Sequence, residues 1–151
     1  MDLPAWEVLC MVSNRKSTLT KNHIAQIKTE VKQAAIDHLH AKDAQTALSH
    51  FTDDVIAVSN TQLFPNLEAL SEDVKAYYNI LKEVNRAVWD EMHINVINKD
   101  TAVLTAKFFY SFTDTNDEKT DLQGVWTAVY VRRDECWKIC VRNESFGGSE
   151  E

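Results

Sequence analysis

The spacing of apolar residues changes near residue 88, and this change constrains the fold more than any other feature of the chain. Before it, apolar side chains recur every three or four residues, as on one face of an amphipathic helix. After it, they alternate every two residues, as in a β-strand. Helical segments followed by consecutive strands predict an α+β domain whose helices cover one face of an antiparallel sheet.

The part before residue 88 predicts three helices and one short strand. The first helix begins near Thr20. Its apolar face consists of Ile24, Ile27, Val31, Ala34, Ala35 and Leu39, with His38 as the polar member. Asp43 is typical of an N-cap and predicts a short second helix. A short strand over residues 55–60 follows, and then a third helix capped by Asn66 or Ser71.

Four long strands are predicted over residues 88–98, 101–113, 122–133 and 136–146. Polar turns separate them, and Gly124 inside the third strand indicates a bulge or a bend that helps the sheet to curl. In the last strand, one phase of the alternation carries Trp137, Ile139, Val141, Asn143 and Ser145. These side chains are expected on one face of the sheet.

The central parts of the strands are apolar on both phases. A sheet that is solvated on one side would alternate cleanly between apolar and polar residues. We therefore expect a second copy of the chain to cover the outer sheet face, through Val103, Phe109, Trp126 and Tyr130. The alternative interpretation is that these are scattered surface side chains.

Length and charge exclude several classes of protein. The 151 residues predict one domain over residues 20–146, with tails at residues 1–19 and 147–151. The formal net charge of −7 argues against a nucleic-acid partner. Four basic residues are assigned to a solvated face: Arg132, Arg133, Lys138 and Arg142. No apolar run reaches the length of a membrane span, and the cysteine spacing favours reduced thiols in a cytoplasmic protein.

Two segments resemble the nuclear-transport-factor-2-like superfamily, especially its SnoaL-like and ketosteroid-isomerase-like branches. They are HLHAKDAQTALSHFTDDVIAV, from His38, and GVWTAVYVRRDECWKICVRNES, from Gly124. The resemblance implies a cone in which three helices wrap a curved antiparallel sheet of four long strands and a short one. It also implies an apolar pocket in the cone and dimers formed through the convex sheet face. Members include isomerases, dehydratases, cyclases and non-catalytic domains, so the resemblance leaves function open.

Catalytic relatives use an Asp or His in the cone for proton transfer. Many carry His on the last strand at positions that match Val141 and Asn143, and neither residue is an acid or base near neutral pH. Asp90, Glu91 and His93 on the first long strand are the other candidates. One register turns Glu91 and His93 inward as a pair, and the other turns Asp90 inward alone. The structural alternative leaves all three in solvent.

Three functions remain open at this point. The first is a domain that binds a small apolar or carbonyl-containing molecule without catalysis. Its expected contacts are Tyr78, Phe108, Tyr110, Thr127, Val141 and Asn143. The second is an isomerase, dehydratase or cyclase with Tyr110 and Asn143 as oxyanion donors. The third is a protein-interaction module with a vestigial cavity. No metal or cofactor motif occurs, and none is predicted.

Overall fold

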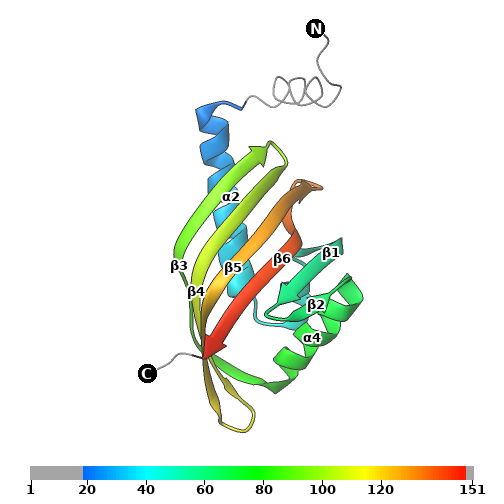
Figure 1. Cartoon of the computed structure of the whole chain (residues 1–151), viewed down its shortest axis with the longest axis vertical. Coiled ribbons are helices and arrows are strands. Elements are labelled where there is room, and N and C mark those ends of the chain that lie inside the picture. Colours follow the sequence, from blue (N-terminus) through cyan, green and yellow to red (C-terminus); the bar gives the residue numbers. More distant parts are fainter. Residues whose placement is uncertain (1–18, 149–151) are drawn as a thin grey trace.

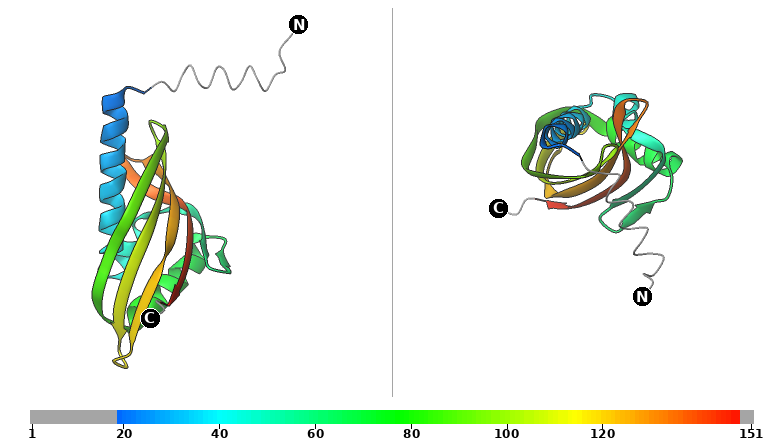
Figure 2. Two further views of the ribbon diagram at one scale, coloured as in Figure 1. Left: turned by 60° about the vertical axis from the view of Figure 1, so that its left-hand side comes forward. Right: turned by 90° about the horizontal axis from the view of Figure 1, so that it is seen from above.

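The computed structural model describes residues 19–148, in which helices lie against one face of a curved sheet (Figure 1). The helices are α2 (Lys21–Leu39), α3 (Ala44–Leu48) and α4 (Leu67–Ile80). The strands are β1 (Phe51–Ser59), β2 (Gln62–Phe64), β3 (Leu81–Asn98), β4 (Thr101–Asp114), β5 (Lys119–Arg133) and β6 (Cys136–Gly148). Seen from above, the long strands curve around α2 (Figure 2). The predicted α+β class and curved sheet are therefore confirmed.

The sheet has six strands in the order β2-β1-β6-β5-β4-β3. The strands β3 to β6 form antiparallel hairpins, whereas β1 lies parallel to β6. The strand count differs from the prediction because β2 is a second short strand, paired with β1. The strand β3 also begins at Leu81, well before residue 88. Residues 82–86 are all exposed, so no apolar alternation marked this part of the strand.

The predicted tails lie almost wholly outside the described residues. Residues 1–18 and 149–151 are not described, while Gly147 belongs to β6. The domain boundaries at residues 20 and 146 stay predictions. Within residues 19–148, no helix is long and apolar enough to cross a membrane.

A side-chain cap begins each described helix. Thr20 Oγ1 accepts the His23 N–H at 3.1 Å at the start of α2. Asp43 accepts the Thr46 N–H at 2.7 Å, which confirms the predicted cap of α3. Asn66, one of the two predicted caps, accepts the Ala69 N–H at 2.9 Å at the start of α4. Each such cap stabilises the domain by about 1 kcal/mol.

The core lies between α2 and the concave face of the sheet. Ile27, Val31 and Ala35 of α2 are each at most 1% exposed, as the predicted helix face requires. They belong to one buried cluster with small and branched residues of the strands: Ala102, Leu104, Ala106 and Ala128. The alanines leave room for the helix to approach the sheet closely, and each large apolar side chain contributes roughly 2 kcal/mol by burial.

A bulge in β6 changes which residues face the helices. Ile139 pairs with Tyr130, but Val141 pairs with Val129, so Cys140 is an extra residue without a partner. Ile139 is buried, Val141 is exposed, and Arg142 is buried again. The expectation that Trp137, Ile139, Val141, Asn143 and Ser145 share one face is wrong beyond Ile139, because the extra residue reverses the alternation.

A second bulge changes the phase of β3. Trp89 pairs with Phe108 and Glu91 with Lys107, which leaves Asp90 unpaired. Trp89 and Met92 consequently both pack against the core, although an uninterrupted strand would turn them to opposite faces. Neither of the two registers considered from the sequence describes the whole strand.

The convex face carries different β5 residues from those expected. Trp126 and Tyr130 are 3% and 0% exposed and belong to the concave core, so their assignment to the convex face is wrong. The alternation instead puts Val125, 47% exposed, on the convex face. Val103 and Phe109 do share that face, and the Arg86 guanidinium lies over the Phe109 ring at 5.3 Å from its centroid.

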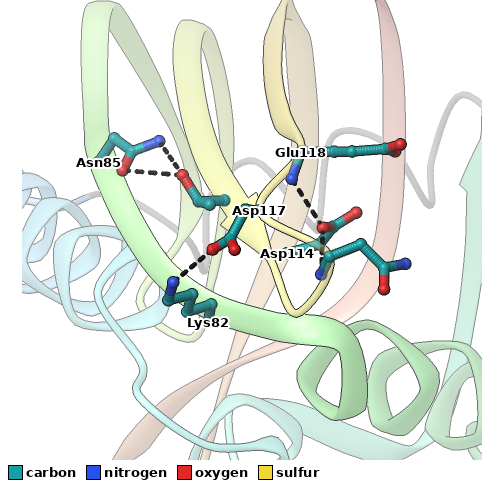
Figure 3. Close-up of polar contacts among 7 residues, drawn as sticks. Lys82, Asn85, Asp114, Asp117 and Glu118 are labelled. Atoms are coloured by element: carbon teal, nitrogen blue, oxygen red, sulfur yellow. Dashed lines mark hydrogen bonds and ion pairs between the residues drawn. The ribbon is translucent and has the colours of Figure 1, made fainter.

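The turn between β4 and β5 is held by its own polar side chains, as its composition predicts. Asp114 accepts the N–H groups of Asn116 at 2.8 Å and Glu118 at 3.0 Å. Figure 3 shows Lys82 of β3 reaching Asp117 in the same turn, where the two side chains form an ion pair. These contacts hold the start of β3 to the end of the hairpin.

The β5–β6 turn is strained, and we expect Glu135→Gly to stabilise the domain. Asp134 and Glu135 both have positive φ, 51° and 65°. A left-handed conformation costs a residue with a side chain about 1 kcal/mol relative to Gly. Thermal unfolding should show a rise in Tm of roughly 3 °C. Glu135→Ala is the matched control and should give no rise, because it removes the charge but keeps Cβ. An equal rise for both variants would contradict the strain argument.

Candidate functional site

A cavity of about 320 Å³ opens on the concave face, between the sheet, the end of α2, α3 and α4. Its lining includes His38, Leu39, Ala47, Phe51, Ser59, Asp73, Val74, Tyr77, Tyr78, Trp89, Phe108, Tyr110, Phe112, Leu122, Trp126, Arg142, Glu144 and Phe146. Every described helix and all strands except β2 contribute to it. The cavity therefore exists only once the sheet has curved around the helices.

One wall of the cavity is aromatic. The Trp89 and Trp126 rings have centroids 5.0 Å apart, and Phe108 meets Trp89 edge to face at 6.2 Å. Trp89 Nε1 donates to the Ala35 carbonyl at 3.0 Å, so its polar atom is satisfied away from the cavity. This wall suits a flat apolar molecule, because aromatic rings pack against one another in offset or edge-to-face arrangements.

Tyrosine hydroxyl groups occupy another part of the lining. Tyr77 of α4 and Tyr110 of β4 hydrogen bond to each other through their hydroxyl groups. Tyr78 donates to the Ala41 carbonyl at 2.9 Å. Burial raises the pKa of Tyr77, and it raises the pKa of Tyr78 to about 12. These hydroxyl groups therefore stay protonated and can donate hydrogen bonds at neutral pH.

A charge pair between the buried Arg142 and the partly exposed Glu144 lies on β6, beyond the bulge. Arg142 is 7% exposed, and its Nη2 lies 3.2 Å from Glu144 Oε1. Ser59 of β1 donates its hydroxyl to the same Glu144 oxygen at 3.0 Å. The Arg142 guanidinium also lies 6.0 Å from the centroid of the Phe51 ring. The cavity lining thus includes a cationic side chain beside Phe51.

His38, near the end of α2, contacts the same region. Its ring is 5.1 Å from Phe51 and 5.2 Å from His50, measured between centroids. Its Nδ1 has neither a hydrogen-bond partner nor solvent access. Burial, together with the nearby His50 and Arg142, lowers the pKa of His38 to about 3. The imidazole is therefore neutral at physiological pH.

Comparison with known proteins identifies the family. The profile of the SnoaL-like domain matches residues 29–147. The chain belongs to the SnoaL-like family. The stated resemblance is thereby confirmed. No curated protein matches this SnoaL-like chain significantly.

Solved structures resemble the SnoaL-like domain over most of its length. A candidate scytalone dehydratase from Novosphingobium aromaticivorans DSM 12444 has a TM-score of 0.77 at 11% identity, over 87% of this chain and 89% of its own. A hexachlorocyclohexane dehydrochlorinase, LinA type 2, has a TM-score of 0.68 at 14% identity, over 87% of this chain and 94% of its own. A ketosteroid isomerase-like protein from Erwinia carotovora atroseptica SCRI1043 has a TM-score of 0.67 at 14% identity, over 78% of this chain and 94% of its own. At sequence identities this low, the likeness shows a shared fold alone.

Only some of the predicted ligand contacts lie at the cavity of this SnoaL-like domain. Tyr78, Phe108 and Tyr110 line it, and their contact with a ligand stays a prediction. Thr127 pairs with Thr105 on the convex side. Val141 and Asn143 come after the β6 bulge, which places them on the convex side as well. These three residues are absent from the cavity lining, so their predicted position on its wall is wrong.

The three predicted acid–base residues lie outside the cavity of the SnoaL-like domain. Glu91 and His93 are hydrogen-bonded at 2.8 Å, as their spacing suggests, but their side chains are 56% and 69% exposed. Lys107 lies 3.6 Å from the same carboxylate. Asp90 is the exposed bulge residue of β3. The cavity instead contains Arg142, which the sequence assigned to a solvated face.

Proposed function

We propose that this SnoaL-like domain binds a small, largely aromatic molecule in the concave cavity. The observation that carries the proposal is the aromatic lining around a volume of about 320 Å³. Small-molecule sites are concave, mostly apolar and fitted with a few polar groups that orient the ligand, typically at volumes of ~300–1,000 Å³. A two-ring aromatic molecule is of suitable size for the lower end of this range.

Calorimetric titration with two-ring probes tests this proposal. We expect at least one of 2-naphthoate, 2-naphthamide and 2-acetonaphthone to bind with a stoichiometry of about one per chain. Val74→Trp should abolish this binding, because Val74 of α4 lines the cavity and a larger side chain would fill it. Ala76→Trp is the matched control, because Ala76 is an exposed residue of the same helix. Equal binding by both variants would contradict a site in the cavity.

An isomerase- or dehydratase-type enzyme is the second candidate. Relatives of the same fold are named for elimination and isomerisation reactions, which move a proton. His38 is the one imidazole in the cavity lining among the described residues. Its pKa of about 3 makes it a weak base, whereas a general base works best with a pKa near the operating pH. We therefore take ligand binding as the primary proposal, because the aromatic lining supports it directly.

We also propose that two copies associate through the convex sheet face. Val125 and Val141, 47% and 44% exposed, lie on this face with Val103 and Phe109. Sedimentation velocity should give a dimer for the wild type, and the double variant Val125→Glu/Val141→Glu should be monomeric. Charges buried at an interface without partners cost several kcal/mol. Ile80→Glu, which changes an exposed residue at the end of α4, should stay dimeric. A monomeric wild type would disprove the association.

A further inference from the structure

The Arg142 guanidinium is buried without enough hydrogen-bond acceptors. The β6 bulge turns this side chain inward, where it is 7% exposed. Its Nε and Nη2 atoms have no hydrogen-bond partner and no solvent access. Burying a charged group without hydrogen bonds is costly, and buried polar groups in folded proteins are nearly always paired. Arg142 is thus a buried cation that its neighbours stabilise incompletely.

Glu144 neutralises Arg142 but does not satisfy its donors. Glu144 Oε1 lies 3.2 Å from Nη2, at a distance for an ion pair but without the geometry of a hydrogen bond. The same oxygen already accepts the Ser59 hydroxyl at 3.0 Å. A guanidinium binds a carboxylate best through two parallel N–H bonds along one edge, such as that formed by Nε and Nη2. Glu144 does not make this arrangement.

The surroundings indicate what kind of molecule would stabilise this charge. Phe51 lies beside the guanidinium and 5.1 Å from His38, and His38 lies 6.1 Å from Trp126, measured between ring centroids. Because Arg142 and the aromatic wall line the same cavity, a planar ligand on that wall can extend a substituent toward Arg142. We propose that the ligand of this cavity carries a carboxylate group, whose negative charge pairs with the Arg142 guanidinium where this side chain lines the cavity. This inference rests on the proposed binding function and specifies the class of ligand.

The three naphthalene probes separate the two proposals, because they share a ring system and differ in the polar group. Wild-type protein should bind 2-naphthoate at least about tenfold more tightly than 2-naphthamide or 2-acetonaphthone, since charge-assisted hydrogen bonds are roughly twice as strong as neutral ones. Arg142→Gln should remove this preference, so that 2-naphthoate and 2-naphthamide bind with affinities within about threefold of each other. Arg142→Lys should retain part of the preference, because it keeps the positive charge but loses the planar guanidinium with its several N–H donors.

Glu144→Gln gives a second and milder test. This variant keeps the side-chain shape and an acceptor for Ser59, but it removes the negative charge beside Arg142. Affinity for 2-naphthoate should rise by about threefold or more relative to the affinity for 2-naphthamide. If Arg142→Gln does not fold, as judged by circular dichroism, Glu144→Gln decides the question.

Three results would overturn the inference while the binding function stands. The first is equal wild-type affinity for the carboxylate and the amide. The second is no gain in carboxylate affinity in Glu144→Gln, and the third is a carboxylate preference that Arg142→Gln leaves intact. Binding of none of the three probes would overturn both the inference and the proposed function.

Discussion

Gly124→Ala is expected to destabilise the domain by about 3 kcal/mol, at the upper end of the usual cost of overpacking. A Cβ atom at this position would lie 2.1 Å from the Ser145 carbonyl oxygen and 2.8 Å from Phe146 Cβ. The nearest atom belongs to the backbone of β6, so no side-chain rotation can relieve the clash. The two strands would have to separate where Gly124 pairs with Phe146. Gly124 thus provides close approach between strands, and the pairing shows no bulge at this position.

Urea unfolding measures this cost, and Gly147→Ala is the matched control. Gly147 also lies in the β5–β6 pairing, but a Cβ there would have no atom within 4 Å. The control should change the free energy of unfolding by less than about 0.5 kcal/mol. Gly124→Ala should also lower Tm by roughly 9 °C. Equal small effects of both substitutions would show that β6 can move away from Gly124 at little cost.

The second large effect is a loss of stability on mild acidification. The pKa of His38 is about 3 in the folded domain, against 6.5 for an unperturbed imidazole. Below pH 6.5 the unfolded chain therefore takes up a proton that the folded domain does not, and folding becomes less favourable as the pH falls. The free energy of unfolding should decrease by about 2.5 kcal/mol between pH 7 and pH 4.5.

Most of this pH window lies above the unperturbed pKa values of Asp and Glu, 3.8 and 4.5. A hydrogen bond with Arg133 lowers the pKa of Asp54 to about 2, so its contribution to stability is lost only below the unperturbed value of 3.8. Burial also lowers the pKa of His50, which therefore acts in the same direction as His38. Urea unfolding of His38→Gln at the same pH values should show a much flatter dependence. An unchanged slope in this variant would assign the effect to other groups.

Helix positions could be predicted from the sequence because the helical pattern depends on local spacing. The spacing of Ile27, Val31 and Ala35 already identified the buried face of α2, and all three are in the core. Asp43 identified the start of α3, because a cap needs only its own helix. His38 was recognised as the polar member of the same face, but its unpaired Nδ1 depends on residues that are distant in sequence.

The strand faces could be predicted only as far as the first bulge. Trp137 and Ile139 are expected on the same face of the sheet, and both are buried, at 9% and 0% exposed. Beyond Cys140 the same alternation gave the wrong face, so Asn143 was expected at the cavity in place of Arg142 and Glu144. In β3, the bulge at Asp90 likewise removed the predicted acid–base residues from the cone.

The sequence by itself therefore determined the fold class, the order of the helices and long strands, and the family. These properties follow from short-range apolar periodicity and from motifs that span only a few residues. The tertiary structure decided which side chains line the cavity. A β-bulge forms where two strands must curve together, and its position depends on the pairing of both strands. One unpaired residue, Cys140, consequently turns Arg142 inward, where the sequence alone had assigned it to solvent.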